Sequence, residues 1–389
     1  MDAAPADPSQ GKWRESRAAD VRALPYLQGY KPARDRPLVV EHDPAEVAPG
    51  LNLLLSGHAA EAVLMDHQGK TLHRWRYPLR RLWPDLRDDP GMARLEYWRR
   101  AWLFPNGDLL GIYEGLGIVK LNARSEVLWS RRGGFHHDLQ VLEDGRIWVL
   151  DRDGKVLPRI NPEEGVLEDF VTVLDPRGEV VRRISLLESF ERSGFASLLD
   201  RMERSGDIFH TNTLEVLDGR HAGRGPAFRK GNLLVSVLKL DALAVVDPDR
   251  GEVVWAKTGS WRRQHQPTFL DTGNLLLFDN RGPLGDRSRV IEIDPLSGEV
   301  VWQYGGTPET DLFSKTLGSC QRLPNGNTLI TESENGRALE VTRDGRVVWE
   351  LHNPNRAGER QELVAVLFEM IRLPEGFPFR GLGERFGER

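Results

Sequence analysis

Two short sequence phrases alternate through the chain from residue 51 onward, and their repetition is the strongest constraint on the fold. The first phrase ends an apolar stretch in a tight turn, as in Phe104-Pro105-Asn106-Gly107 and Leu323-Pro324-Asn325-Gly326. Asp-Gly and Asn-Gly pairs favour two-residue hairpin turns, because those turns need positive φ angles. The copies of this phrase end at Gly107, Gly145, Gly273, Gly326 and Gly376.

The second phrase closes each unit with a short strand that usually ends in tryptophan. Its copies are residues 71–75, 126–129, 179–182, 252–255, 299–302 and 346–349. About six copies at spacings of about 50 residues are typical of a β-propeller with four short strands per blade. We therefore predict an all-β, six-bladed β-propeller, in which the closing tryptophans pack between blades.

The order of the phrases predicts how the ring closes. Residues 51–56 resemble a second strand with no first strand before them, whereas residues 367–373 resemble a first strand with nothing after them. We expect strands from the two ends of the chain to share one blade, which would leave no open sheet edge. The predicted division is an irregular N-terminal arm over 1–50, a propeller over 51–376 and a tail over 377–389. A short helix is expected near 16–24, and the insertion over 186–204 is expected to form a helix or a lid.

Composition excludes several classes of function. The net charge of −5 over 389 residues does not suggest the basic surface that nucleic-acid binding requires. No apolar run approaches the roughly 18 residues of a membrane span. Cys320 is the only cysteine, so an intrachain disulfide and a thiolate zinc cluster are both excluded. The first ten residues are polar, so the chain as it stands is expected in the cytoplasm, or in the periplasm if a leader was removed. The oligomeric state stays open.

Three histidines occupy nearly the same position in three consecutive repeats. His137, His210 and His265 each come just before a predicted first strand, and the first strands line the channel of a propeller. We therefore expect the three side chains to meet at one mouth of the channel. His136 competes with His137 for this place, and only one of the two should face the channel because neighbouring residues of a strand point to opposite faces.

Two kinds of chemistry suit a histidine cluster without obvious carboxylate partners. Neutral imidazoles bind transition metals. Imidazole also serves as a nucleophile and as an acid or base near neutral pH. Transfer of an anionic group would need positive charge nearby. Arg99 and Arg100 are expected at the same mouth and could supply it.

Several motifs together resemble the bacterial arylsulfate sulfotransferase family. They are His136-His137-Asp138-Leu139, Phe209-His210-Thr211-Asn212, Gln264-His265-Gln266-Pro267, Phe278-Asp279-Asn280 and the segment 321–333. The resemblance covers roughly residues 50–375. It implies a six-bladed propeller that moves a sulfuryl group from an aryl sulfate to a phenol, through a transiently sulfated histidine and with no nucleotide sulfate donor as cofactor.

The resemblance also implies roles for particular residues. His265 matches the sulfated nucleophile, and His210 and His137 match histidines that hold the sulfuryl oxygens or move the phenolic proton. Asn212 and Asp138 match residues that orient their neighbours.

The chain departs from the family pattern at one place. The family often carries an arginine in the strand after the Phe-His-x-Asn segment, but Leu238 stands at the matching position here. Lys239 or Arg281 would have to replace it. We therefore include Lys239, Arg281, Arg100 and His136 among the expected substrate-binding residues.

Two alternatives to sulfuryl transfer remain open at this stage. The first is a metal-dependent propeller enzyme with His137, His210 and His265 as ligands. The second is a binding propeller whose catalytic site has decayed, which the missing arginine favours. The other histidines, such as His73 and His352, lack the repeated phase and are expected to be structural or exposed.

Overall fold

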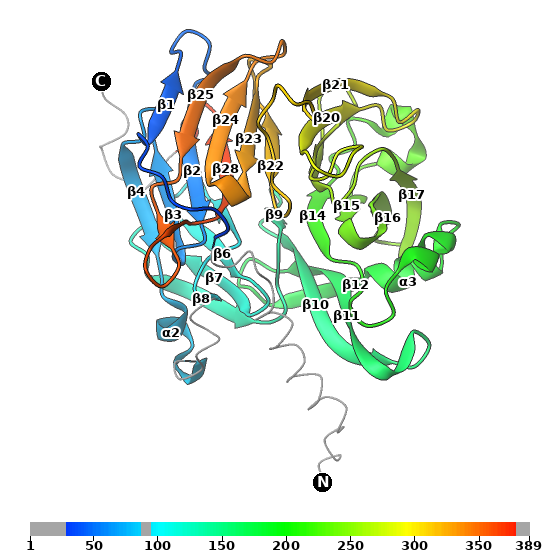
Figure 1. The fold of residues 1–389 in the computed structure, drawn as a ribbon. Helices are drawn as coiled ribbons and strands as arrows, with labels where there is room; N and C mark the ends of the chain where they lie inside the picture. The colour runs from blue at the N-terminus through cyan, green and yellow to red at the C-terminus, as the bar shows by residue number, and fades with distance from the viewer. Residues whose placement is uncertain (1–28, 87–94, 379–389) are drawn as a thin grey trace.

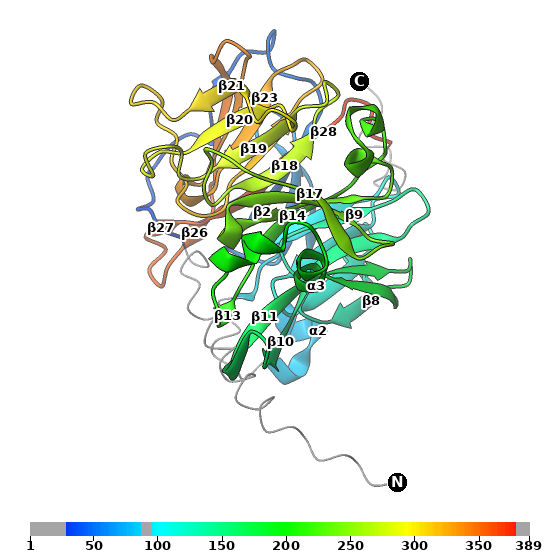
Figure 2. The same cartoon turned by 90° about the vertical axis from the view of Figure 1, so that its right-hand side faces the viewer.

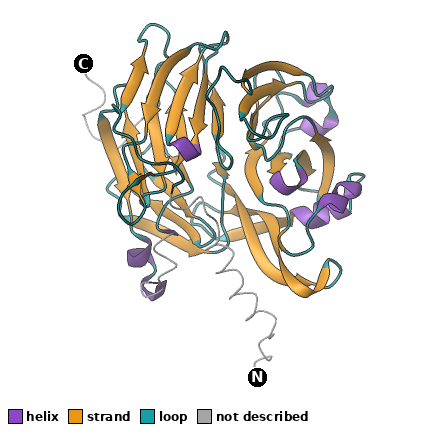
Figure 3. Cartoon of the chain, in the orientation of Figure 1, coloured by secondary structure: helices purple, strands orange, loops and turns teal. Residues whose placement is uncertain are grey.

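Six antiparallel sheets make up a ring in this computed structural model, which describes residues 29–86 and 95–378. Figures 1 and 2 show the blades around a common centre, and Figure 3 shows that strands dominate the described chain. The prediction of a six-bladed β-propeller is confirmed. The helix expected near 16–24 lies outside the described residues.

Each blade has four strands in the order in which they are hydrogen-bonded from the centre outward. Blade one contains β28 (Leu367–Leu373), β2 (Leu51–Ser56), β3 (Glu61–Met65) and β4 (Thr71–Arg76). Blade two contains β5 (Arg100–Leu103), β6 (Leu109–Tyr113), β7 (Gly117–Leu121) and β8 (Val127–Arg132). Blade three contains β9 (Leu139–Val141), β10 (Ile147–Leu157), β11 (Asn161–Leu174) and β12 (Val180–Ser185), and β13 (Gly206–Asp207) pairs with β11.

The remaining blades follow the same plan. Blade four contains β14 (Thr211–Val216), β15 (Leu233–Val237), β16 (Ala242–Asp247) and β17 (Glu252–Thr258). Blade five contains β18 (His265–Phe269), β19 (Leu275–Asp279), β20 (Arg289–Ile293) and β21 (Val300–Gly305). Blade six contains β22 (Ser319–Arg322), β23 (Thr328–Glu332), β24 (Arg337–Val341) and β25 (Val347–His352).

Strands from both ends of the chain build blade one, as the order of the phrases predicts. The late strand β28 pairs antiparallel with the early strand β2, with Leu53 opposite Ile371. Part of the predicted arm also joins the ring, because β1 (Val39–His42) pairs with β25 as a fifth strand of blade six. The short hairpin of β26 (Arg356–Ala357) and β27 (Leu363–Val364) lies between β25 and β28 in the chain.

The closing tryptophans form hydrogen bonds to the neighbouring blade. The indole N–H of Trp75 in blade one donates to the carbonyl of Gly107 in blade two, at 2.9 Å. Trp349 in blade six donates to His67 in blade one at 2.8 Å, so the same contact also spans the closure of the ring. The predicted packing of these tryptophans between blades is confirmed.

Helices are few and short in the described chain. The α-helices are α2 (Leu79–Leu82) and α3 (Leu186–Glu191), and the 3-10 helices are η2 (Pro84–Leu86), η4 (Ala196–Arg201), η5 (Ala222–Arg224), η6 (Pro226–Phe228), η7 (Leu238–Leu240) and η8 (Ser333–Asn335). Ser185 caps the start of α3, because its hydroxyl accepts from Glu188 N at 3.0 Å. This helix lies within the insertion 186–204, where a helix or a lid is expected. Among the described residues, no helix has the length and apolar character needed to cross a membrane.

The antiparallel order of the strands fixes where a site can form. In every blade the first strand begins, and the second strand ends, at the same face of the ring. Residues just before a first strand and just after a second strand therefore meet around one mouth of the channel. His137 and His210 belong to the first of these groups, and His265 is the first residue of β18.

Candidate active site

A narrow cavity at this mouth is lined by residues from all six blades. Its positive charge comes from two adjacent arginines of blade two, and its imidazoles come from blades three and five. The lining residues are Arg99, Arg100, His137, Asp138, Asn212, His265, Gln266, Gly318, Phe368 and Glu369. The histidine phase seen in the sequence thus corresponds to real proximity in space.

The ring of His265 is held in one orientation by two acceptors. Its Nδ1 lies 2.7 Å from Asn280 Oδ1 and 3.0 Å from the carbonyl oxygen of Arg263. The amide of Asn280 is itself oriented, because its Nδ2 donates to the carbonyls of Ser314 and Leu317. Two acceptors at Nδ1 require a proton there, so the Nε2 atom of the neutral ring keeps its lone pair.

Burial keeps this imidazole neutral. His265 is only 4% exposed. Burial, together with the positive charges of Arg99 and His210, lowers the pKa of His265 to about 3, although the hydrogen bonds of Nδ1 act in the opposite direction. At neutral pH the Nε2 lone pair is therefore available without prior loss of a proton.

His210 is held in place by one carboxylate, which hydrogen-bonds to both its backbone and its ring. Asp207 Oδ2 lies 2.5 Å from Nδ1 of His210, and Asp207 Oδ1 accepts from the backbone N–H of His210 at 2.8 Å. Burial alone would raise the pKa of Asp207, but the charge and hydrogen bond of His210 outweigh it and hold that pKa below its usual value. The backbone of His210 has a left-handed φ of 49°, a strained conformation that these two bonds help to hold.

His137 repeats this arrangement with a different carboxylate. Glu114 Oε1 lies 3.4 Å from Nδ1 of His137, and Glu114 Oε2 accepts from the backbone N–H of His137 at 3.2 Å. The φ of His137 is 50°, which matches that of His210. The two rings are T-shaped neighbours with centroids 4.8 Å apart. His210 thus lies beside the cavity, in contact with a histidine that lines it.

His136 lies behind His137 rather than in the cavity lining. Its Nδ1 is 2.9 Å from Nδ1 of His137, and its Nε2 is 3.9 Å from Asp169 Oδ1. Burial and the charge of Arg152 hold the pKa of His136 well below its usual value, and burial and the charge of Arg99 do the same for His137. Of the two adjacent histidines, His137 is the one that faces the cavity.

The two arginines of blade two differ in how their charges are balanced. Arg100 Nε lies 2.9 Å from Asp138 Oδ1 in an ion pair, and Arg100 Nη1 pairs with Glu369 Oε1. Arg99 is only 6% exposed, yet among the described residues no carboxylate lies within 4.0 Å of it, and its guanidinium stands 5.4 Å from the ring centroid of Phe368. A buried cation without a counter-ion favours an anion in the space that it lines.

The structure brings some of the other expected substrate-binding residues to the cavity and leaves others away from it. Asn212 lines the cavity, and its Nδ2 donates to the carbonyl of Gln264 at 2.8 Å. Lys239 instead pairs with Glu203 at 2.8 Å, and Arg281 donates to the carbonyl of Gly285 at 3.2 Å. Neither Lys239 nor Arg281 is among the residues that line the cavity, so the one uncompensated cation there is Arg99 among the described residues.

The residues that hold the histidines were not identified from the sequence. Glu114 and Asn280 each directly follow a second strand, β6 and β19, so their shared phase was a usable signal. Asp207 gave no such signal, because it ends the insertion that precedes β14. Its contacts with His210 are local, three residues apart, but no repeated position marks it.

One group of side chains near the cavity has atoms spaced closely enough for a metal ion. The ligand atoms of Glu114, His136 and His137 all lie within 4.8 Å of one another, and all three side chains are buried. This group differs from the His137, His210 and His265 set expected from the sequence. The ring of His136 contributes from behind the cavity, and His210 and His265 lie outside the group.

Several solved structures share features of the fold at low similarity. A protein of unknown function from Bacteroides caccae is 15% identical, with 82% of this chain and 97% of that chain covered and a TM-score of 0.49. A streptogramin B lyase is 11% identical, with coverage of 84% and 88% and a TM-score of 0.46. The β-propeller domain of Cps50 (Swd1) from Myceliophteria thermophila is 12% identical, with coverage of 84% and 90% and a TM-score of 0.46.

These structural likenesses carry no argument about function. A search of curated proteins found no match to the chain. The informative comparison is with protein families, where the arylsulfotransferase (ASST) model matches residues 113–354. That range includes the three phased histidines and the residues that hold them, and it spans more than half of the sequence. The chain therefore belongs to the arylsulfotransferase (ASST) family.

Proposed function

We propose that the protein transfers a sulfuryl group from an aryl sulfate to a phenol through a sulfated His265. The observation that carries this proposal is the combination of a neutral His265, held with Nδ1 protonated and Nε2 unprotonated, and an uncompensated Arg99 in the same cavity. A nucleophile beside an unpaired cation suits attack on an anionic group.

The first half of the reaction sulfates the enzyme. The Nε2 lone pair of His265 attacks the sulfur atom of the aryl sulfate, an N–S bond forms and the S–O bond to the aryl group breaks. The departing phenolate takes a proton from Nε2 of His210. Asp207 supports this step, because it holds Nδ1 of His210 at 2.5 Å and stabilises the charged form of the ring.

The second half reverses the first with a different phenol. The acceptor phenol gives its proton to Nε2 of His210, its oxygen attacks sulfur, and the N–S bond breaks to restore His265. Arg99 and the amide of Asn212 are the groups that would hold the sulfuryl oxygens in both halves. The scheme needs no nucleotide sulfate donor and no metal.

The test is phenol release from a chromogenic aryl sulfate, with and without a second phenol. We expect release that accelerates with the acceptor, together with a mass increase of one sulfuryl group on a peptide containing His265. His265→Ala should abolish both. His73→Ala is the matched control, because His73 contacts the carbonyl of Ala123 at 2.8 Å and the ring of Trp75, and it is not among the residues that line the cavity. No release from folded protein, or release unaffected by His265→Ala, would refute the proposal.

A metal-dependent enzyme is the second candidate, and one observation favours it. Glu114, His136 and His137 bring a carboxylate and two imidazoles together, a donor set that binds divalent transition metals. The positive charges of Arg99 and Arg152 disfavour a metal cation at this group, since they already lower the pKa values of the histidines in it. Metal analysis of protein purified without a histidine tag decides between the two candidates.

A further inference from the structure

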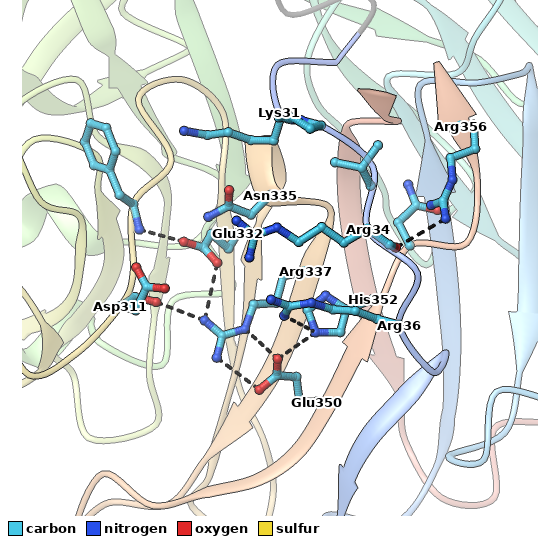
Figure 4. A pocket seen from close by; sticks show the side chains of 14 residues that line it. Lys31, Arg34, Arg36, Asp311, Glu332, Asn335, Arg337, Glu350, His352 and Arg356 are labelled. Carbon is cyan, nitrogen blue, oxygen red and sulfur yellow. Dashed lines mark hydrogen bonds and ion pairs between the residues drawn. The ribbon is translucent and has the colours of Figure 1, made fainter. Parts of the chain in front are cut away.

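A second, larger cavity lies over blade six, on the same face of the ring as the histidine cavity. Its walls come from the ends of β23 and β25, the start of β24, the segment 311–313, and the N-terminal segment 31–36. Its volume is about 410 Å³, which is within the usual range for pockets that bind small organic molecules. Figure 4 shows its side chains from close by. We call it the basic pocket.

The floor of the basic pocket is a closed set of ion pairs. Arg337 donates to both carboxylate oxygens of Glu350, at 2.9 and 3.0 Å, and its Nη1 lies 3.4 Å from Glu332. His352 Nε2 lies 2.9 Å from Glu350 Oε1. Burial opposes ionisation of Glu350, but its bonds to His352 and Arg337 outweigh burial and lower its pKa to about 2. The floor therefore holds its charges in a fixed arrangement.

The rim carries cations that this floor does not neutralise. Among the described residues, no carboxylate lies within 4.0 Å of the charged ends of Lys31 and Arg34, and Arg36 contacts only the ring of His352, at 3.2 Å. Arg356 pairs with one carboxylate, that of the exposed Asp35, at 3.6 Å, and it also donates to the carbonyl of Arg34 at 3.3 Å. In Figure 4, Lys31 and Arg34 extend from the N-terminal segment into the pocket.

Counting the charged side chains gives the pocket a net positive charge. Five basic side chains line it against three carboxylates, which leaves two positive charges in excess. The carboxylates of Glu332 and Glu350 are bound to Arg337 and His352, and Arg356 pairs with Asp35 outside the lining. Within the described chain, the positive charges without a carboxylate partner therefore lie at the rim, on Lys31 and Arg34 among others.

Backbone pairing holds these rim cations in place. The segment 31–36 is pinned beside β27, where Ala33 N donates to Glu362 O at 2.8 Å and Val364 N donates to Lys31 O at 3.0 Å. Pro32 and Leu363 form a bridge in the same ladder. The cations are thus part of the wall of the pocket, and little ordering of the backbone is required before they bind a ligand.

The basic pocket is distinct from the histidine cavity, because two segments of chain lie between them. In the segment 313–318, Phe313 lines the basic pocket and Gly318 lines the histidine cavity. In the segment 364–368, Val364 lines the basic pocket and Phe368 lines the histidine cavity. Phe313 and Val364 add apolar surface to the basic pocket, so a ligand with an organic body fits better than an inorganic ion.

We propose that the basic pocket binds a small organic anion with two negative charges, held at the rim by Lys31 and Arg34. The size of the pocket limits the ligand to a small molecule, the excess of two positive charges sets its charge, and the Phe313 and Val364 surface accepts its carbon skeleton. This binding does not depend on the sulfuryl transfer proposed above.

The test is calorimetric titration of the full chain with benzene-1,3-disulfonate at constant ionic strength, with benzenesulfonate in parallel. We expect the dianion to bind and the monoanion to bind about tenfold more weakly or worse, because it lacks one charge-assisted contact. The variant Lys31→Gln/Arg34→Gln should weaken binding of the dianion by a similar factor or more. Both residues are exposed, so the variant should fold normally.

Two control proteins locate the binding. Arg124→Gln/Lys230→Gln removes the same charge from exposed sites elsewhere and should leave the affinity unchanged. His265→Ala should also leave it unchanged, because His265 belongs to the other cavity. No binding of the dianion, equal loss in the control double variant, or loss in His265→Ala would overturn the proposal.

Discussion

Replacing Arg99 with methionine separates a catalytic role of this arginine from a structural one. The guanidinium is buried and, within the described chain, has no carboxylate to balance it. An anion about 4 Å from such a charge gains roughly 4 kcal/mol at an effective dielectric constant of about 20. Loss of a single preorganised donor in a comparable site costs about 10²–10³ in rate. We therefore expect Arg99→Met to slow sulfuryl transfer by about 10²–10³-fold while the fold remains intact.

Arg100 provides the matched control, because it is the adjacent residue in the same cavity. Its charge is balanced by Asp138 and Glu369, so Arg100→Met would leave two buried carboxylates without their cationic partner and with only neutral donors. Breaking a buried pair in this way costs about 3–5 kcal/mol of stability. We thus expect Arg100→Met to lower the free energy of unfolding. Arg99→Met should leave the free energy of unfolding unchanged or raise it.

The assay combines single-turnover phenol release with denaturant unfolding of both variants. Single-turnover data isolate the step in which His265 attacks sulfur. If Arg99→Met retains its rate within about fivefold, or loses as much stability as Arg100→Met, then Arg99 serves the fold and the anion argument fails.

Three further predictions concern the groups that hold the histidines. Asp207→Asn should slow transfer by about 10²-fold or more, because His210 would lose its orientation and its support as a proton donor. The loss of rate should grow with the pKa of the leaving phenol. Rates across a series of substituted aryl sulfates check this, and an equal loss of rate for every phenol would contradict it. Asn280→Leu should lower the rate of His265 sulfation about tenfold with little change in KM, because the 2.7 Å bond that fixes the ring is lost. A change in KM alone would contradict this role of Asn280. The folded pKa of His265, about 3, lies below its unfolded value of about 6.5, so the folded state binds fewer protons and stability is fully present above about pH 6.5 and declines as the pH falls toward 3. Urea unfolding of His265→Gln over this range should therefore show a shallower loss of stability than the parent chain.

The repeats made most of the fold predictable, because their information is local. A turn such as Pro105-Asn106-Gly107 and a strand that ends in Trp129 are encoded within a few residues. The closure of blade one followed from the same phrases, since a missing first strand at residue 51 and a spare one at 367–373 complete each other. The phase of the histidines was visible for the same reason.

The partners of the histidines were harder to predict because they come from three different places: the neighbouring blade for His137, three residues earlier in the chain for His210, and the end of the paired strand for His265. Glu114 reaches His137 from the neighbouring blade, and Asp207 approaches His210 from an insertion with no repeated phase. Lys239 and Arg281, the expected replacements for the family arginine, lie outside the cavity, whereas Arg99, also expected at this mouth, lines it. In a propeller all first strands converge on one axis, so Arg99 of blade two can supply a cation to a cavity shared with blades three and five.

The low pKa of His265 has two opposing consequences for the proposed reaction. A weakly basic imidazole is a poorer nucleophile, which slows formation of the N–S bond. It is also a better leaving group, which speeds transfer of the sulfuryl group from His265 to a phenol. The cavity offsets the first effect with the charge of Arg99, which attracts the anionic donor, and with the bond from Nδ1 to Asn280, which fixes the direction of Nε2. The same burial that weakens the base therefore suits a histidine whose task is to pass the group on rather than to retain it.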